Sequence, residues 1–474
     1  MRQLPFATKK KNVMNDSNKI TLQSLGAAQT VTGSKHLLRT PELTLLVDCG
    51  LFQGIKTLRE KNWEDIPVNP AEVDALILTH AHLDHCGYIP LFVKRGFRGK
   101  IYMTPPTADL AEIILYDSAK IQVEDAERAN RMGFSKHKPA LPLYDEKDVD
   151  KAIPLFQTVE HSIEHRLSPK VSFLFRKNGH ILGAASSVLN CHGKIIVFSG
   201  DIGRYESRFL LPPSSIPEAD LVVMESTYGD RLHGDNDPLD ELAEVINRVI
   251  QRHGSLIIPS FAVGRAQEIM HLVNTLKSEQ RIPASLPVFL DSPMAADATQ
   301  ILCRHTQWHK LKHDECMSVC NDVVINRDFR QTKKIISTPG PKIIISASGM
   351  LTGGRVLEYL KHLAPDPKNA ILLIGYQAEG TRGRRLKNGE RELKIHGQYV
   401  PVRASLEDIS GLSGHADQAE LLQWLSQMGQ AVQKVILVHG EGPAQDTFRK
   451  KIEQDLHIPA FIAKEDEETT LFNL

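Results

Sequence analysis

The stretch THAHLDHCGYIP, residues 79–90, places three histidines and an aspartate between His80 and His85. The preceding run DALILT predicts a strand that ends at Thr79, so these side chains should lie on the loop at its carboxyl end. Imidazole and carboxylate ligands together suit zinc or a similar cation. A polar loop with hydrogen-bonded histidines is the alternative. The H-x-H-x-D-H spacing favours metal binding.

Composition sets broad limits on this chain. Its 474 residues can bury a large core and predict more than one domain. Lys+Arg and Asp+Glu both number 57, so no global basic field indicates a polyanionic partner, although a local basic groove stays compatible. The six cysteines form no CxxC pair, which favours a reduced, cytoplasmic protein. No apolar run approaches the roughly 20 residues of a membrane helix.

Two patterns follow one another along the chain. After an expected flexible leader over 1–19, short apolar strands alternate with turns and helices, which predicts an α/β fold with its chemistry on loops. From about residue 230, strand and helix alternate over about 140 residues, which predicts a separate parallel-sheet module. The expected strands of the first part are 43–47, 75–78, 100–103, 171–175, 195–198 and 221–224, with a helix near 108–128.

Four further ligand-type residues follow expected strands. His180 lies in NGHILGAASSV, Asp201 in VFSGDIGR, His439 in VILVHGE and Asp48 in LLVDCG. Each alone is compatible with an ordinary polar residue. Together with the opening stretch they give seven ligands for two metal ions and one supporting acid.

These motifs resemble those of the metallo-β-lactamase superfamily and, within it, the β-CASP ribonucleases, which include ribonuclease J and the cleavage-and-polyadenylation endonuclease. VVMESTYGDR resembles motif A at Glu225, SGLSGHADQAELLQWL resembles motif B at His415, and VILVHGE resembles motif C at His439. PSFAVGRAQE, LDSPMA and IISASGMLTGGR are typical of the β-CASP domain. The resemblance covers roughly residues 20–460.

The resemblance implies a metallo-β-lactamase αββα sandwich (20–230 and 396–474) interrupted by an inserted α/β β-CASP domain (231–395). It also implies two zinc ions per chain. The first would take His80, His82 and His180, and the second Asp84, His85 and His439, with Asp201 bridging and Asp48 orienting ligands. The catalytic residues would be Glu225, His415 and Asp84.

Glu225 and His415 suit general acid catalysis, because a carboxylate fixes a neighbouring imidazole and raises its pKa. The alternative is a strand-end acid and a histidine near a helix start. Ser346 and Ser348, with Arg382 and Arg384, are candidate phosphate contacts. An ordinary turn and a solvated arginine run are the alternatives there. Arg265 is a weaker candidate that would otherwise cap or salt-bridge its helix.

The sequence therefore predicts a zinc-dependent ribonuclease that cuts single-stranded RNA internally, with a homodimer as a further possibility. A metallo-β-lactamase-type hydrolase of a small ester or thioester is the first alternative. It would need neither the insertion nor a histidine at the SGHA position. An inactive scaffold is the second alternative, which the complete ligand set disfavours.

Overall fold

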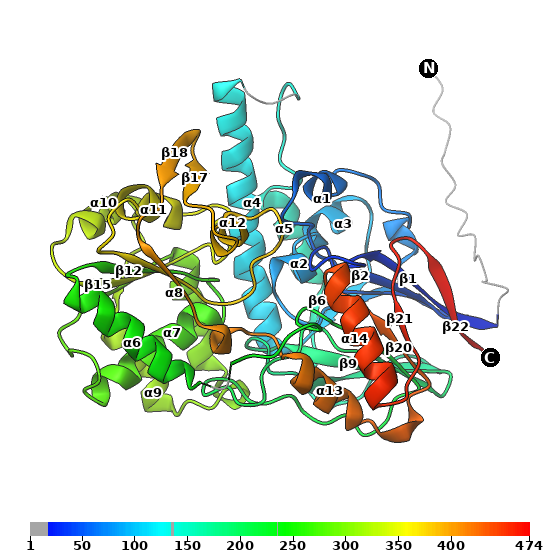
Figure 1. The fold of residues 1–474 in the computed structure, drawn as a ribbon. Helices are drawn as coiled ribbons and strands as arrows, with labels where there is room; N and C mark the ends of the chain where they lie inside the picture. The colour runs from blue at the N-terminus through cyan, green and yellow to red at the C-terminus, as the bar shows by residue number, and fades with distance from the viewer. Residues whose placement is uncertain (1–17, 134–136, 235) are drawn as a thin grey trace, which may run out of the picture.

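The computed structural model describes residues 18–133, 137–234 and 236–474. The expected leader therefore lies almost wholly outside the described residues. Within the described part, the strands form two seven-stranded sheets, one six-stranded sheet and a two-stranded hairpin. The two larger sheets lie in the right half of Figure 1 and the six-stranded sheet in the left half, with the long helix α4 (Pro105–Met132) between them.

The first sheet joins the beginning and the end of the described chain, because β1 pairs with β22 in antiparallel fashion. From β3 to β6 its neighbouring strands run parallel. In spatial order the sheet consists of β22 (Glu468–Asn473), β1 (Lys19–Gly26), β2 (Lys35–Arg39), β3 (Thr44–Val47), β4 (Ala75–Ile77), β5 (Lys100–Met103) and β6 (Phe156–Thr158).

The second sheet contains the strands that lead into most of the distant motifs. Parallel pairing joins β10, β11, β20 and β21, while β7 to β10 are antiparallel. Its spatial order is β21 (Ala460–Ile462), β20 (Lys434–Leu437), β11 (Leu221–Met224), β10 (Lys194–Phe198), β9 (Ala185–Cys191), β8 (Val171–Lys177) and β7 (His165–Ser168).

Alternating side chains pack these sheets face to face and leave their outer faces to helices. Leu45 and Leu221 belong to the apolar core between the sheets. Their neighbours Leu46 and Val222 belong instead to the cores formed with helices. The first sheet is covered by α3 (Ile89–Lys94), α4 and α5 (Glu146–Ala152), and the second by α13 (Gln418–Ser426) and α14 (Gly442–Asp455). This is the predicted αββα sandwich.

The third sheet is parallel throughout, and its four central strands are almost wholly buried, as continuous apolar strands predict. Its order is β14 (Val324–Ile325), β13 (Val288–Asp291), β15 (Lys342–Ser346), β12 (Ser255–Pro259), β16 (Ala370–Leu373) and β19 (Ser405–Asp408). Its helices are α6 (Pro238–Gln251), α7 (Arg265–Ser278), α8 (Pro293–Arg304), α9 (His313–Asn321), α10 (Phe329–Ser337), α11 (Val356–Leu363) and α12 (Arg382–Lys387). The remaining short elements are α1 (Lys56–Lys61), α2 (Leu83–Cys86) and the hairpin β17 (Glu392–Ile395) with β18 (Gln398–Pro401).

The whole third sheet is inserted between two adjacent strands of the second one. The chain leaves after β11 and returns before β20, which pairs directly with β11. The insertion reaches further than expected, because β19 lies beyond residue 395 and still pairs with β16. Since β11 and β20 are neighbours, the residues that follow them, Glu225 and His439, lie side by side.

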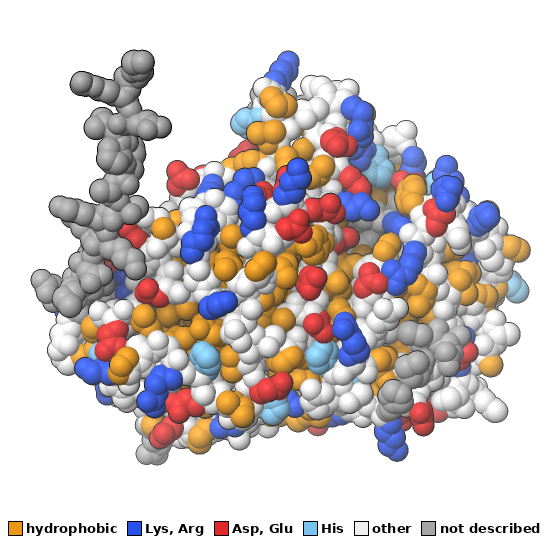
Figure 2. All heavy atoms as spheres, turned by 180° about the vertical axis from the view of Figure 1, so that it is seen from behind, with side chains coloured by type: hydrophobic (Ala, Val, Ile, Leu, Met, Phe, Trp, Pro, Cys, Tyr) orange, Lys and Arg blue, Asp and Glu red, His pale blue; other side chains and the backbone are white. Residues whose placement is uncertain are grey.

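The structure differs from the expectation for the cysteines. Cys303 and Cys316 form a disulfide between α8 and α9, whereas the cysteines were expected to be reduced. None of the helices in the described residues is both long enough and apolar enough to cross a membrane. On the face shown in Figure 2, Lys and Arg side chains are interspersed with Asp and Glu. A polyanion would therefore have to be recognised locally on that face rather than by an extended basic field.

Candidate metal centre and active site

The residues expected around the first ion converge on one point. His82 Nδ1 lies 3.2 Å from His80 Nε2 and 3.1 Å from His180 Nε2. Asp201 Oδ2 lies 3.5 Å from the same two Nε2 atoms. Loops after β4, β8 and β10 carry these side chains, so the strand-end positions noted in the sequence meet in space.

The residues expected around the second ion form a neighbouring group. Asp84 Oδ2 lies 3.5 Å from His439 Nε2, and His85 Nε2 lies 3.3 Å from Asp201 Oδ1. The short helix α2 carries Asp84 and His85, while His439 follows β20. Asp201 turns Oδ2 towards the first group and Oδ1 towards the second, which is the arrangement a bridging ligand requires.

The donor atoms of the second group fit a cation. His85 Nε2, His439 Nε2 and Asp201 Oδ1 are buried and have no hydrogen-bond partner among the described residues. Leaving buried polar atoms unpaired costs free energy, and a bound metal would remove that cost. The first group offers three imidazoles and a carboxylate, and the second offers two imidazoles and two carboxylate oxygens. Both sets of donors suit zinc.

The charges of the centre are strongly coupled. Burial alone would raise the pKa of Asp201, but His439, His85 and His80 hold it well below its usual range. Burial alone would lower the pKa of His85, yet Asp201 and Asp48 raise it well above its usual range. A protonated His85 must lose its proton before Nε2 can bind a metal, so metal affinity should fall as the pH falls.

Asp84 was expected both as a ligand of the second ion and as a catalytic residue. Burial alone would raise its pKa, but the His439 imidazole, 3.5 Å away, and the charge of His85 lower it. A carboxyl group with a lowered pKa is a poor proton donor near neutral pH. Its carboxyl group is therefore better suited to binding a metal than to transferring a proton.

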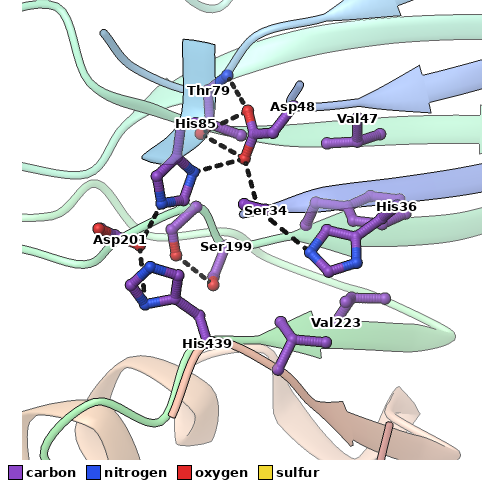
Figure 3. A pocket seen from close by; sticks show the side chains of 13 residues that line it. Ser34, His36, Val47, Asp48, Thr79, His85, Ser199, Asp201, Val223 and His439 are labelled. Atoms are coloured by element: carbon purple, nitrogen blue, oxygen red, sulfur yellow. Dashed lines mark hydrogen bonds and ion pairs between the residues drawn. The ribbon is translucent and has the colours of Figure 1, made fainter. Parts of the chain in front are cut away.

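Asp48 contacts the second group through a hydrogen bond with His85, as Figure 3 shows. Its Oδ2 accepts a hydrogen bond from His85 Nδ1 at 2.7 Å, and its Oδ1 accepts one from the Thr79 backbone N–H at 2.9 Å. The His85 contact fixes the imidazole tautomer and leaves Nε2 facing the centre. The backbone of Asp48 is left-handed, with φ +60°, in the turn where β3 ends.

Sequence reasoning missed the polar residues that support this arrangement. Ser34 Oγ donates to Asp48 Oδ2 at 3.3 Å and also lies 3.3 Å from Nε2 of the buried His36. Thr227 Oγ1 lies 3.2 Å from His439 Nδ1. No spacing marks Ser34 or His36, because they reach the site through the pairing of β2 with β3. Thr227 lies two residues after Glu225, and that proximity was an available signal.

Glu225 and His415 form the predicted pair. Glu225 Oε2 lies 3.1 Å from His415 Nδ1, and Glu225 Oε1 accepts a hydrogen bond from the backbone N–H of Ile202. Burial alone would lower the pKa of His415, but the carboxylates of Glu225, Asp201 and Asp84 together outweigh burial and the pKa is raised. The His415 ring centroid lies 4.4 Å from that of the ligand His180, so this imidazole borders the first metal group.

The four candidate phosphate contacts fall into different environments. Ser346 is 1% exposed and its hydroxyl donates to the carbonyl of Asp291, so in this structure its side chain is directed into the fold. Ser348 Oγ accepts from the backbone N–H of Thr352 within its own turn.

The two arginines also differ. Arg382 donates to the carbonyls of Leu351, Thr352 and Lys394, so its guanidinium supports the fold locally. Arg384 Nη2 instead reaches across to Glu441 Oε2 at 3.2 Å, two residues beyond His439. Of the four candidates, Arg384 is the one whose side chain pairs with a residue close in sequence to an expected metal ligand.

The chain matches three family models. They are the metallo-beta-lactamase superfamily over residues 33–260, the Beta-Casp domain over 266–386 and the Zn-dependent metallo-hydrolase RNA specificity domain over 399–463. The chain is 38% identical over 424 residues to ribonuclease TTHA0252 of Thermus thermophilus, covering 88% of this chain and 92% of that protein.

Two proteins of Methanocaldococcus jannaschii are also similar. An RNase J-like protein is 34% identical over 461 residues, covering 94% of this chain and 98% of that protein. The transcription termination factor FttA is 31% identical over 463 residues, covering 93% of this chain and 70% of that protein. A crystal structure of a protein of unknown function from Enterococcus faecalis shares the fold, with a TM-score of 0.53 at 12% identity, over 96% of this chain and 100% of that one.

Proposed function

Because the chain belongs to the β-CASP ribonuclease family of the metallo-β-lactamase superfamily, we propose that it is a zinc-dependent ribonuclease that cuts single-stranded RNA internally. The observation that carries this proposal is the Glu225–His415 pair beside the two ligand groups. A cytoplasmic location is part of the proposal.

The proposed ligands are those named above, with two zinc ions per chain. When bound, such ions supply Lewis-acid stabilisation of phosphoryl oxygens and activate water at neutral pH. The chain itself would supply the proton for the leaving oxygen. His415 Nδ1 donates to Glu225, which leaves Nε2 of the imidazolium to give its proton to the departing RNA oxygen.

The inserted domain supports a polymeric substrate over a small one. The Phe261 ring lies 5.8 Å from that of His82, while Arg265 donates to Leu412 and Arg384 pairs with Glu441, close in sequence to His415 and His439. A centre bordered by a second domain suits a thin, extended anionic chain better than a rigid duplex. We therefore propose single-stranded RNA as the substrate.

The direct test uses RNA labelled separately at its 5′ and 3′ ends, incubated with zinc-loaded protein. Internal cleavage should give a ladder of intermediate fragments from both labels, whereas degradation from one end should release label from that end first. A matched duplex should be spared. Turnover of a small thioester with no cleavage of either RNA would overturn the proposal in favour of the ester hydrolase.

Arg384→Ala should weaken the salt dependence of RNA binding, because Arg384 is proposed to contact a phosphate beside Glu441. Loss of one contact should reduce the slope of log affinity against log salt by about 0.7 on single-stranded RNA. Fluorescence anisotropy over a salt series measures this slope. Arg449→Ala on α14 is a matched surface control, since Arg449 pairs only locally with Asp446 and Glu453 among the described residues.

The same experiment separates the two arginines. Arg382→Ala should leave the slope unchanged and lower thermal stability instead, because its donors are taken by three carbonyls. An equal change of slope in both variants would show that Arg382 contacts RNA in an orientation other than the one in this structure.

Glu225→Gln should move the alkaline limb of the cleavage rate to lower pH. The carboxylate raises the pKa of His415, so the proton-donating form persists to higher pH in the wild type. Removing the charge lowers that pKa, and the acid form is then lost earlier as the pH rises. Single-turnover rates across pH, at constant metal content, measure the shift. The exposed Glu218→Gln serves as control, and an unmoved limb would exclude His415 as the titrating acid.

A further inference from the structure

Segment 410–416, which carries His415, is held largely by side chains from elsewhere in the fold. Four of its backbone carbonyls accept hydrogen bonds from side chains of four separate segments. The donors are Arg204 to Gly411 at 3.0 Å, Arg265 to Leu412 at 3.2 Å, His180 to Gly414 at 3.0 Å and His233 to His415 at 3.0 Å. The position of His415 therefore depends on residues far away in the sequence.

His233 and Arg265 both come from the inserted segment, and Arg265 is the one that belongs to one of its helices. It begins α7 and is only 7% exposed. Its Nη1 pairs with the equally buried Glu268 and also donates to Leu412. The guanidinium lies directly against the segment, because a Cβ added at Gly414 would be 3.5 Å from Arg265 Cζ and 3.3 Å from His180 Cε1.

We propose that Arg265 is a positioning residue through which the inserted domain holds segment 410–416, and with it His415, against Glu225. The inference rests on the proposed function, in which His415 is the proton donor. Arg204, from the sandwich, holds the adjacent carbonyl and is itself fixed by Glu420 at 3.1 Å. One arginine from each domain therefore donates to consecutive residues, Gly411 and Leu412, which shortly precede His415 in the chain.

The Arg265–Glu268 pair has a geometry that suits this role. Both residues belong to α7, so an ion pair three residues apart would form without any contact to the sandwich. Burying such a pair is costly unless further hydrogen bonds satisfy it, and Leu412 provides one. Glu268 in turn fixes the direction of the guanidinium. The contact with Glu268 thus keeps the Arg265 side chain out of solvent and in its hydrogen bond to Leu412.

The test combines kinetics with hydrogen exchange on the zinc-loaded full chain. Arg265→Met together with Glu268→Gln removes both charges and leaves no lone buried charge. RNA cleavage should fall by up to about 10²-fold in kcat, because a displacement near 1 Å can cost that much. KM and zinc content should stay near wild type. Hydrolysis of bis(p-nitrophenyl) phosphate, whose leaving group needs no proton, should change little.

Two further variants test whether the loss of cleavage comes from the lost contacts of Arg265. Arg265→Lys should recover much of the rate, since an ammonium group can donate to Glu268 and Leu412 together. Arg281→Met with Asp240→Asn removes an exposed pair of the same domain and should behave as wild type. Backbone amides of segment 410–416 should exchange faster in the Arg265/Glu268 variant than in this control.

The outcomes are separable. Wild-type cleavage and unchanged exchange in the Arg265/Glu268 variant would overturn the inference while the ribonuclease proposal stands. Zinc loss, or an equal loss on the nitrophenyl ester, would overturn it too, by showing support of the whole centre rather than of the acid. If zinc-loaded wild type fails to cut RNA, the proposed function fails, and the exchange measurement still decides whether Arg265 holds the segment.

Discussion

His415→Ala should lower the rate of RNA cleavage by about 10²–10⁴-fold, the usual contribution of general acid–base catalysis. The imidazole is 14% exposed while its partner Glu225 is 1% exposed, so His415 is the member of the pair that a substrate can reach. It is not one of the proposed metal ligands, and alanine should leave zinc content and RNA binding unchanged. Single-turnover cleavage, metal analysis and anisotropy measure the three quantities.

A substrate whose leaving group needs no proton should distinguish a proton-donating role of His415 from a structural role. The variant should hydrolyse bis(p-nitrophenyl) phosphate at a rate close to wild type, because nitrophenolate departs unprotonated. His362→Ala, at an exposed position on α11, is the matched control. Undiminished cleavage of ordinary RNA by His415→Ala would reduce this histidine to a residue near a helix start.

The convergence of the ligands was predictable from the sequence because of where the strands end. Asp201, Glu225 and His439 follow β10, β11 and β20, which are adjacent parallel strands. The carboxyl ends of parallel strands meet at one edge of a sheet, so polar residues in those positions come together. Asp48 and His80 follow β3 and β4, another adjacent parallel pair.

Contacts made by long or inward-facing side chains were not predictable in this way. Ser346 also follows a parallel strand, yet its hydroxyl turns inward to the carbonyl of Asp291. Arg265 lies in a motif typical of the family and Arg382 in a run of arginines, but the direction of a flexible side chain depends on which carbonyls tertiary packing brings near. The extent of the insertion was missed for a similar reason, since β19 joins its sheet only through pairing with β16.

Asp201→Ala should empty the metal centre. Asp201 Oδ2 lies 3.5 Å from two histidines of the first group, and Oδ1 lies 3.3 Å from His85 in the second, so one substitution removes a ligand from both. It also removes the charge that helps hold five imidazoles around two cations. We expect bound zinc to fall from about two ions per chain, the complement of a two-metal site, towards none, with loss of RNA cleavage.

Metal analysis after dialysis measures the zinc, and thermal unfolding with and without added zinc shows whether the apo chain stays folded. Zinc should raise the melting temperature of the wild type, since a ligand that binds only the native state stabilises it. It should not raise that of Asp201→Ala. Asp366→Ala, an exposed aspartate of the inserted domain, should keep the wild-type response. Full zinc occupancy in Asp201→Ala would refute a bridging role, and a wild type that is active without metal would refute the ligand assignment altogether.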